Sequence, residues 1–240
     1  GRAAFAGRLD EADALTEEAL AIHRRHGEDC YQEHTVARLV LARLRWRPQD
    51  ADLAQLRGFA ARYPHLPVWE AMLASLEWEL GNADAARRGV EVCARDGFAA
   101  VAGSPDFLPA ALCLADPTAG TGEPAQVERL YELLAPHASA NPVLMFLWGA
   151  FGPVARGLAL LAAADDRPRD AAGHFENALA LCEQWDAPGW ALRTIGDWLA
   201  TGVPAPDRTA LARRGLALAS ELGLPGVAAR IADEAQTITP

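Results

Sequence analysis

The chain has 240 residues, 51% of them hydrophobic, and a formal net charge of −10. Alanine and leucine dominate over β-branched residues, which predicts an all-α protein because straight-chain side chains lose little rotamer freedom in a helix. The acidic balance argues against a nucleic-acid surface, since a phosphate backbone needs a concentrated positive stripe. All 22 basic residues are arginine, so a phosphate-binding P-loop and a Schiff-base lysine are both excluded.

The first predicted element is a turn and helix in "GRLDEADALTEEALAIHRRHG", residues 7–27. The preceding "GRAAFAG" looks like the end of a helix whose beginning is missing. A helical array without its terminal cap exposes apolar surface, so we expect Leu9, Leu15 and Ile22 to lie beside an uncovered edge. We therefore expect residues 1–240 to form one helical-repeat domain that is a fragment of a longer chain.

Four residues near the end of this helix contain zinc-ligand types: His23, His26, Cys30 and His34. "HGED" at 26–29 is typical of a helix end, which would scatter the four side chains. Histidines there also lie favourably against the helix dipole. The sequence therefore favours a structural role, with no metal and no cofactor. All four cysteines of the chain are far apart in apolar stretches, which predicts reduced core residues of a cytoplasmic protein.

The turn-plus-helix pattern recurs with a period of roughly 40 residues, which is typical of stacked supersecondary units. Residues five, nine and twelve positions after each turn are mostly apolar and share one helix face, because their spacings are four and three. Thr16, Asp52 and Gly215 depart from this stripe, so the second and last units are degenerate. The pattern predicts about five to six units, with turns anchored at Gly7, Arg47, Gly81, Gly122, Asp166 and Pro206.

An antiparallel partner helix is expected before each turn. Start signals precede three of these helices: Pro67 precedes "VWEAMLASLEWEL", residues 104–106 precede "FLPAALCLA", and Pro188 precedes "WALRTIGDWLA". Connections are rich in proline and glycine, and the longest one expected is "DPTAGTGEP" at 116–124.

Residues 142–164 form an apolar segment in which Arg156 is the single charge. The segment is nominally long enough to cross a bilayer. However, an arginine near its middle costs about 2.5–3.5 kcal/mol on insertion scales, and Gly152-Pro153 interrupts the helix. The sequence favours a short apolar approach, a break at Gly152, and a buried helix with Pro153 in its first turn.

These patterns resemble tetratricopeptide repeats. "RGFAARYPHLPVWEAMLASLEWELGNADAARRGVEV" (57–92), "LYELLAPHA" (130–138), "GPVARGLALLA" (152–162) and "HFENALALCE" (174–183) are similar to the C-terminal repeat regions of large bacterial signalling ATPases. Those proteins join a nucleotide-binding ATPase module to the repeats and add an adenylate cyclase domain or a LuxR-type DNA-binding domain. The resemblance implies a tetratricopeptide-like solenoid, and it implies none of the attached activities for this chain.

A binding site is expected on the inner curve of the solenoid, which the first helix of each pair lines. Arg156 and Arg193 stand on apolar first helices with few acidic neighbours, so each must find a buried carboxylate or face a cleft. We expect both arginines, with Trp78 as an aromatic neighbour, to form a positive patch for an acidic peptide or an anionic metabolite. Arg156→Glu should then abolish binding and leave the fold nearly intact.

The expected function is a non-catalytic repeat module that binds a protein or peptide segment and regulates an attached signalling ATPase, cyclase or transcription-regulator domain. The alternative is a small-molecule inducer sensor with its ligand on the concave face. A closed polar pocket would favour the sensor, and an open groove with a charged floor would favour the peptide binder. No direct contact with nucleic acid or membrane is expected.

Overall fold

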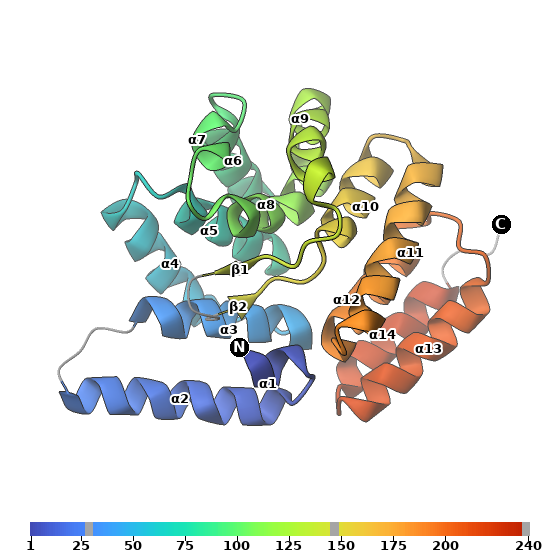
Figure 1. Cartoon of the computed structure of the whole chain (residues 1–240), viewed down its shortest axis with the longest axis horizontal. Coiled ribbons are helices and arrows are strands. Elements are labelled where there is room, and N and C mark those ends of the chain that lie inside the picture. The colour runs from blue at the N-terminus through green and yellow to red at the C-terminus, as the bar shows by residue number, and fades with distance from the viewer. Residues whose placement is uncertain (27–30, 145–148, 237–240) are drawn as a thin grey trace.

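The computed structural model of the chain describes residues 1–26, 31–144 and 149–236. The protein is all-α, with 77% of the described residues in helices (Figure 1). Its first half contains α1 Arg2–Phe5, α2 Leu9–His26, α3 Tyr31–Arg45, α4 Asp50–Arg62, α5 Pro67–Glu79, α6 Ala83–Ala94, α7 Ala99–Ala102 and α8 Phe107–Thr121. Its second half contains α9 Pro124–Leu134, a 3-10 turn Ala135–His137, β1 Val143–Leu144, β2 Gly149–Ala150, α10 Val154–Ala164, α11 Pro168–Gln184, α12 Pro188–Thr201, α13 Arg208–Glu221 and α14 Pro225–Gln236.

The helices pack as sequential pairs. In each pair a first helix (α3, α5, α8, α10 or α12) contacts a second helix (α4, α6, α9, α11 or α13) that follows it in the chain. Neighbouring pairs are also in contact, α4 with α5, α6 with α8, α9 with α10, and α11 with α12. The predicted all-α arrangement of antiparallel helix pairs is therefore confirmed.

The same turn closes several first helices. Gly7, Gly81 and Asp166 have left-handed φ angles of 76°, 81° and 52°. In each turn the amide of this residue and the amide of the next donate to carbonyls at the end of the first helix, with N–O distances of 2.9 and 2.8 Å in the turn at Gly81. This is the Schellman arrangement, in which glycine is favoured and aspartate is tolerated. Asp166 thus takes the place of glycine, as the repeat pattern predicts.

The second unit differs by one residue in its turn. Trp46, not Arg47, has the left-handed φ angle, 51°, and α4 begins at Asp50. The connection is one residue longer than in the turn at Gly81. The stripe positions of the following helix are therefore still counted from Arg47, although Arg47 is not the turn residue. The anchor at Arg47 is corrected to Trp46.

The expected long connection at 116–124 is wrong, because α8 continues to Thr121 with Pro117 inside it. A proline in a helix interior removes one hydrogen bond and normally ends the helix. Here Asp116 and Pro117 are buried between neighbouring helices, and tertiary packing outweighs the local preference. Only Gly122 and Glu123 connect α8 to α9.

The apolar segment 142–164 breaks at Gly152, whose φ angle is 84°, and α10 follows at Val154 with Pro153 as its N-cap. The approach to this break was expected only as an apolar stretch. In the structure it forms a two-stranded antiparallel ladder that pairs Val143 with Ala150, and β2 packs on α3. Among the described residues, no helix combines the length and apolar character needed to cross a bilayer.

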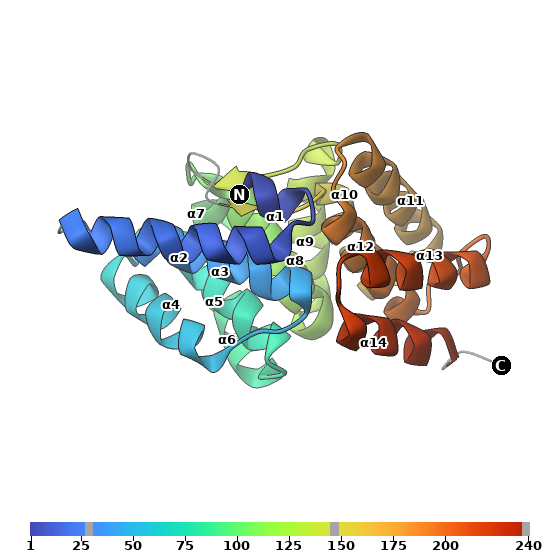
Figure 2. The same cartoon turned by 90° about the horizontal axis from the view of Figure 1, so that it is seen from below.

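The array curves until its ends meet. Contacts join α1 and α3 to α12, and Figures 1 and 2 show the N-terminal helices beside the C-terminal ones. The closeness of this junction is visible at Gly7, where an added Cβ would lie 2.6 Å from Leu222 and 2.8 Å from Pro188. The first helices of all five pairs are thereby turned toward a common centre.

The face of α2 that contains Leu15 and Ile22 is exposed beyond the first turns of the helix. Ala12 is 4% exposed, but Leu15 is 50% and Ile22 40% exposed, as expected for an uncovered edge, whereas Leu9 is buried. The short α1 covers only the beginning of α2. The second helices α6 and α11 pack against the longer first helices α5 and α10. The stripe residues of α6 and α11 are all buried: Ala86, Val90, Cys93, Ala171, Phe175 and Ala178.

We predict that exchanging both Leu15 and Ile22 for glutamine leaves the free energy of unfolding within about 0.5 kcal/mol of the wild type, because surface substitutions remove little buried area. Leu20→Ala on the same helix should lose about 2–5 kcal/mol, because Leu20 is buried. Denaturant unfolding measures both. A loss above about 1 kcal/mol in the double variant would mean that Leu15 and Ile22 are covered in the folded protein.

Candidate functional site

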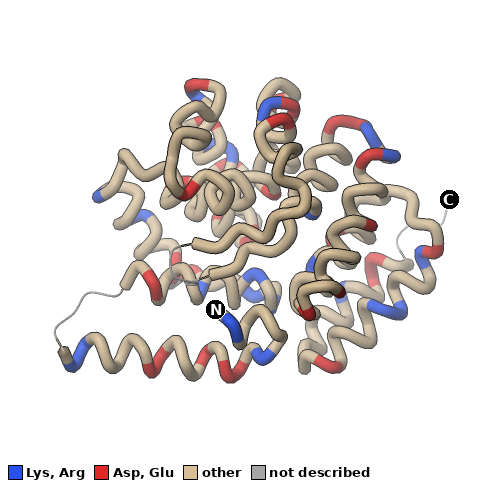
Figure 3. Tube along the Cα trace, in the orientation of Figure 1, with Lys and Arg blue, Asp and Glu red and all other residues tan. Residues whose placement is uncertain are grey.

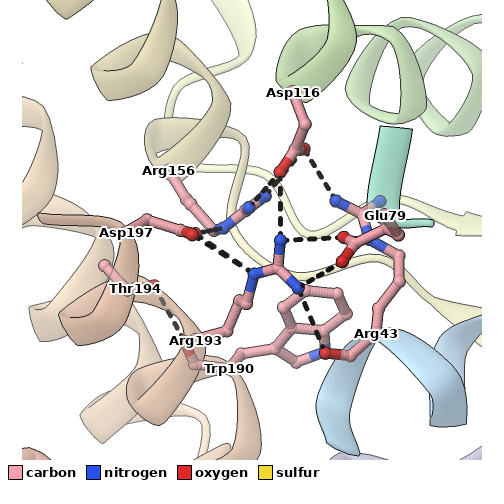
Figure 4. A network of polar contacts seen from close by, with 8 residues as sticks. All are labelled: Arg43, Glu79, Asp116, Arg156, Trp190, Arg193, Thr194 and Asp197. Carbon is pink, nitrogen blue, oxygen red and sulfur yellow. Dashed lines mark hydrogen bonds and ion pairs between the residues drawn. The ribbon is translucent and has the colours of Figure 1, made fainter. Parts of the chain in front are cut away.

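Six charged side chains meet where the first helices converge (Figure 4). They come from every first helix in turn, and we call them the central ion network: Arg43 of α3, Glu79 of α5, Asp116 of α8, Arg156 of α10, and Arg193 and Asp197 of α12. None of the six side chains is more than 16% exposed. Three guanidinium groups face three carboxylates, so the formal charges of the network cancel.

Asp116 is the shared acceptor of the network. It receives hydrogen bonds from Nη2 of Arg43 at 2.7 Å and from Nη1 and Nη2 of Arg156, the first at 3.1 Å. Nη2 of Arg193 completes the set at 3.5 Å. Charge-assisted contacts from three arginines to one carboxylate fix the distances between α3, α8, α10 and α12.

Arg193 is saturated by groups from three helices. Its guanidinium lies 2.8 Å from Oε1 of Glu79, and its Nη1 donates to the backbone carbonyl of Arg43 at 3.3 Å. Its Nε lies 3.3 Å from Asp197, which also accepts from Nε of Arg156 at 2.5 Å. The donors of Arg193 are therefore already engaged within the protein.

The protonation states follow from this pairing. Burial alone would raise the pKa of Asp116, but the charges of Arg156 and Arg43 outweigh burial and hold that pKa well below its ordinary range. Burial would likewise lower the pKa of Arg156, but Asp116 and Asp197 raise it above its ordinary value. The pKa of Arg193 is raised in the same way, chiefly by Glu79 against the opposing effect of burial. All of these groups are charged at neutral pH.

The expected positive patch of Arg156 and Arg193 is wrong. Arg156 is 1% exposed and forms internal salt bridges, so it is a core residue, and Arg156→Glu is now expected to unfold the protein. The sequence left open whether each arginine meets a carboxylate or a cleft, and the carboxylate outcome holds for both. Sequence reasoning missed Asp116 because it interpreted that position as part of a loop. A single acid in the apolar run "LCLAD" was the available signal.

A cleft of about 750 Å³ opens on one side of the network. We call it the central cleft, and Trp78 and Arg193 both line it, whereas Arg156 does not. Its other lining groups include Trp46, Glu79, Asp197 and Arg230. Trp78 and Arg193 thus border one cleft, whose lining contains carboxylates where a positive floor was expected.

Two indole rings are seated on glycines at the wall of the central cleft. A Cβ added at Gly120 would lie 2.1 Å from Cη2 of Trp78, and one at Gly196 would lie 2.0 Å from Cη2 of Trp46. Any larger residue at either position would displace the ring. The small residues of α8 and α12 therefore position two aromatic side chains beside the charged floor.

The expected zinc-ligand types are not assembled into a site among the described residues, and His26 is exposed. Nε2 of His34 lies 3.0 Å from Oε1 of Glu17, and no group of three or more potential ligands within the described residues could hold a metal ion. Cys30 lies outside the described residues. Burial raises the pKa of the remaining thiols to about 12, so they are protonated at neutral pH: Cys93, Cys113 and Cys182.

Comparison with protein-family models, with curated proteins and with solved structures gives no match. The fold and the site define the protein as an all-helical array of sequential helix pairs, joined at its centre by a buried ion network.

We predict that Asp116→Asn lowers the free energy of unfolding by about 3–5 kcal/mol, because it leaves three buried guanidinium groups with two carboxylates. Asp84→Asn is the control, since Asp84 is 88% exposed and lies 3.8 Å from Arg87. Exposed pairs of this kind contribute about 0–1 kcal/mol. Equal stability of the two variants in urea unfolding would contradict the structural role of Asp116.

The low pKa of Asp116 also predicts a direction for acid sensitivity. A carboxylate with a depressed folded-state pKa stabilises the protein fully above its unfolded value of about 3.9, and this contribution declines as pH falls below that value. The stability difference between the wild type and Asp116→Asn should therefore be constant from pH 7 to 5 and narrow from pH 4 to 2. Urea unfolding across this range measures it, and a difference that widens in acid would show that the shift has the opposite sign.

Proposed function

We propose that the chain is a non-catalytic helical-repeat module that binds a protein or peptide segment at the central cleft. Its likeness to tetratricopeptide repeats supports a role in regulating an attached signalling ATPase, cyclase or transcription-regulator domain. The sequential helix pairs and the recurring turns at Gly7, Gly81 and Asp166 support this assignment.

The central cleft is the observation that carries the proposal. Its floor is charged, desolvated and held by contacts from five helices, and its wall presents the partly exposed ring of Trp78. Rigid aromatic anchors beside polar groups are typical of sites where a few residues supply most of the binding energy. A pre-formed floor also lowers the entropic cost of binding, because fewer groups must be ordered when the ligand binds.

A small-molecule inducer sensor is the second candidate. The volume of about 750 Å³ favours it, because pockets of roughly 300–1,000 Å³ suit small ligands. A second cleft of about 1,200 Å³, which shares Trp46 and Arg230 with the central cleft, favours a chain segment instead.

Further features of the proposal are a cytoplasmic location and no direct contact with nucleic acid. The protonated thiols of the three described cysteines agree with a reducing compartment. Figure 3 shows basic and acidic residues interspersed along most helices, and an interspersed pattern lacks the positive stripe that phosphate backbones require.

We predict that peptides selected from a random displayed library against the chain bind Trp78→Ala at least tenfold more weakly, as for an aromatic hot spot. Trp185→Ala is the matched control, because Trp185 is also partly exposed but lines neither cleft. Isothermal titration measures the affinities, and circular dichroism checks that both variants fold.

Failure of the library to yield a binder would reject the peptide function. If a mixture of metabolites instead raised the melting temperature of the wild type and of Trp185→Ala but not of Trp78→Ala, the sensor would replace it. Equal losses in the two tryptophan variants would reject the central cleft as the site.

A further inference from the structure

A second cleft of about 1,200 Å³ lies where the two ends of the array meet. We call it the terminal cleft. It is lined by the turn between α1 and α2, by the end of α3 with the following turn, and by the turn between α13 and α14 with the start of α14. Trp46 and Arg230 line both the terminal and the central cleft, so the two clefts are neighbours.

Most arginines of the terminal cleft are neutralised within it. Arg8 pairs with Glu11 at 2.6 Å. Arg38 pairs with Asp52 at 2.8 Å. Arg45 pairs with both Asp10 and Asp13 at 2.7 Å. These contacts also engage every acidic residue of the lining except Glu221.

Arg47 and Arg230 are the two remaining cations of the lining. Both are exposed, and neither forms an ion pair with any residue that the structure describes. Both line the terminal cleft, and the guanidinium carbon of Arg230 is 4.9 Å from the ring of Trp46, the residue that precedes Arg47.

Trp46 holds this arrangement in place. The guanidinium carbon of Arg193 lies 5.5 Å from the same ring, and Arg193 is anchored in the central ion network. The ring is further seated on Gly196. A guanidinium over an aromatic ring keeps its donors directed to the edge, where a carboxylate can accept two of them.

We propose that Arg47 and Arg230, beside Trp46, form an anion-binding site that binds an acidic side chain of a peptide seated in the terminal cleft. This inference rests on the proposed peptide-binding function and assigns the charge of the ligand. The volume of the terminal cleft, about 1,200 Å³, exceeds the range of roughly 300–1,000 Å³ that suits small ligands, which favours an extended segment over a small anion. Three carboxylates, Glu79, Asp116 and Asp197, and one arginine of the network line the central cleft, so Arg47 and Arg230 are the source of selectivity for an acidic ligand.

Glu221 opposes the site. It is exposed, lines the terminal cleft and forms no ion pair with a described residue. An acidic ligand is repelled by this carboxylate, so the sign of its effect on affinity is a separate test of the ligand charge.

The experiment uses two acetylated and amidated peptides, one alternating glycine with glutamate and one alternating glycine with glutamine. Binding is followed by the NMR shift of the Trp46 indole, which Trp46→Phe identifies. The glutamate peptide should bind at least tenfold more tightly, and Arg47→Gln or Arg230→Gln should each weaken it about fivefold to tenfold. Glu221→Gln should strengthen it, and added salt should weaken it.

Arg213→Gln is the matched control, because Arg213 is exposed on α13 and lines neither cleft. Equal binding of the two peptides, or an equal loss in the control, overturns the anion site. Inorganic phosphate that binds as tightly as the glutamate peptide overturns the peptide assignment in favour of a small anion.

The anion site and the proposed function fail in different ways. If library-selected peptides depend on Trp78 but bind both arginine variants like the wild type, the anion site is wrong and the peptide-binding function stands. If the glutamate peptide depends on both arginines while selected peptides ignore Trp78, the site stands and the central cleft loses its role.

Discussion

The fold depends on the neutralisation of three buried arginines by carboxylates that come from different helices. Desolvating a guanidinium is costly, and the cost is recovered only when the geometry of its partners is complete. Asp116 contributes most to that geometry because it accepts from Arg43, Arg156 and Arg193. Nε and Nη1 of Arg43 form no hydrogen bond, and Nε lies 3.5 Å from Oε1 of Glu79. Since the three arginines lie on α3, α10 and α12, a change in the curvature of the array would pull at least one pair apart. The network therefore selects one curvature from the many that stacked helix pairs can adopt.

Local chemistry was sufficient to predict the helix pairs and most of their turns. Gly81 is needed for a left-handed turn, and Asp166 can replace glycine there because a short polar side chain tolerates that conformation. Gly215 was interpreted as a defect of the stripe, yet a Cβ at this position would lie 2.9 Å from both Ile195 and Ile231. Its small size allows close helix approach, which depends on neighbours that a repeat pattern does not specify. The repeat pattern also does not reveal the displaced turn at Trp46. One additional loop residue there leaves the apolar stripe of the following helix unchanged.

The candidate site was predictable only in part. An arginine on an apolar helix signals a buried acid or a cleft, but the choice between them is made by residues far away in the chain. Asp116 is 40 residues from Arg156 and 73 from Arg43, and its helix contains a proline that indicates a loop when read locally. The register of the first helices predicts that Arg193 lies on the inner face, and Trp78 is expected there only as its aromatic neighbour. The roles of Arg47 and Arg230 could not be inferred, since they depend on the meeting of the two ends.

Neutrality of the network has a consequence for recognition. The network residues that line the central cleft are Arg193 and the carboxylates Glu79, Asp116 and Asp197, so they contribute rigidity and shape but no unpaired cation to a ligand. Charge selectivity then belongs to exposed groups at the rim, where electrostatic effects are screened and act mainly on association and specificity. Trp46 connects the floor and the rim of the cleft, because Arg193 of the floor and Arg230 of the rim both lie near its ring. Rigidity at the floor thus extends to a rim that remains solvent-accessible, and anchoring and charge discrimination can be altered separately by substitution.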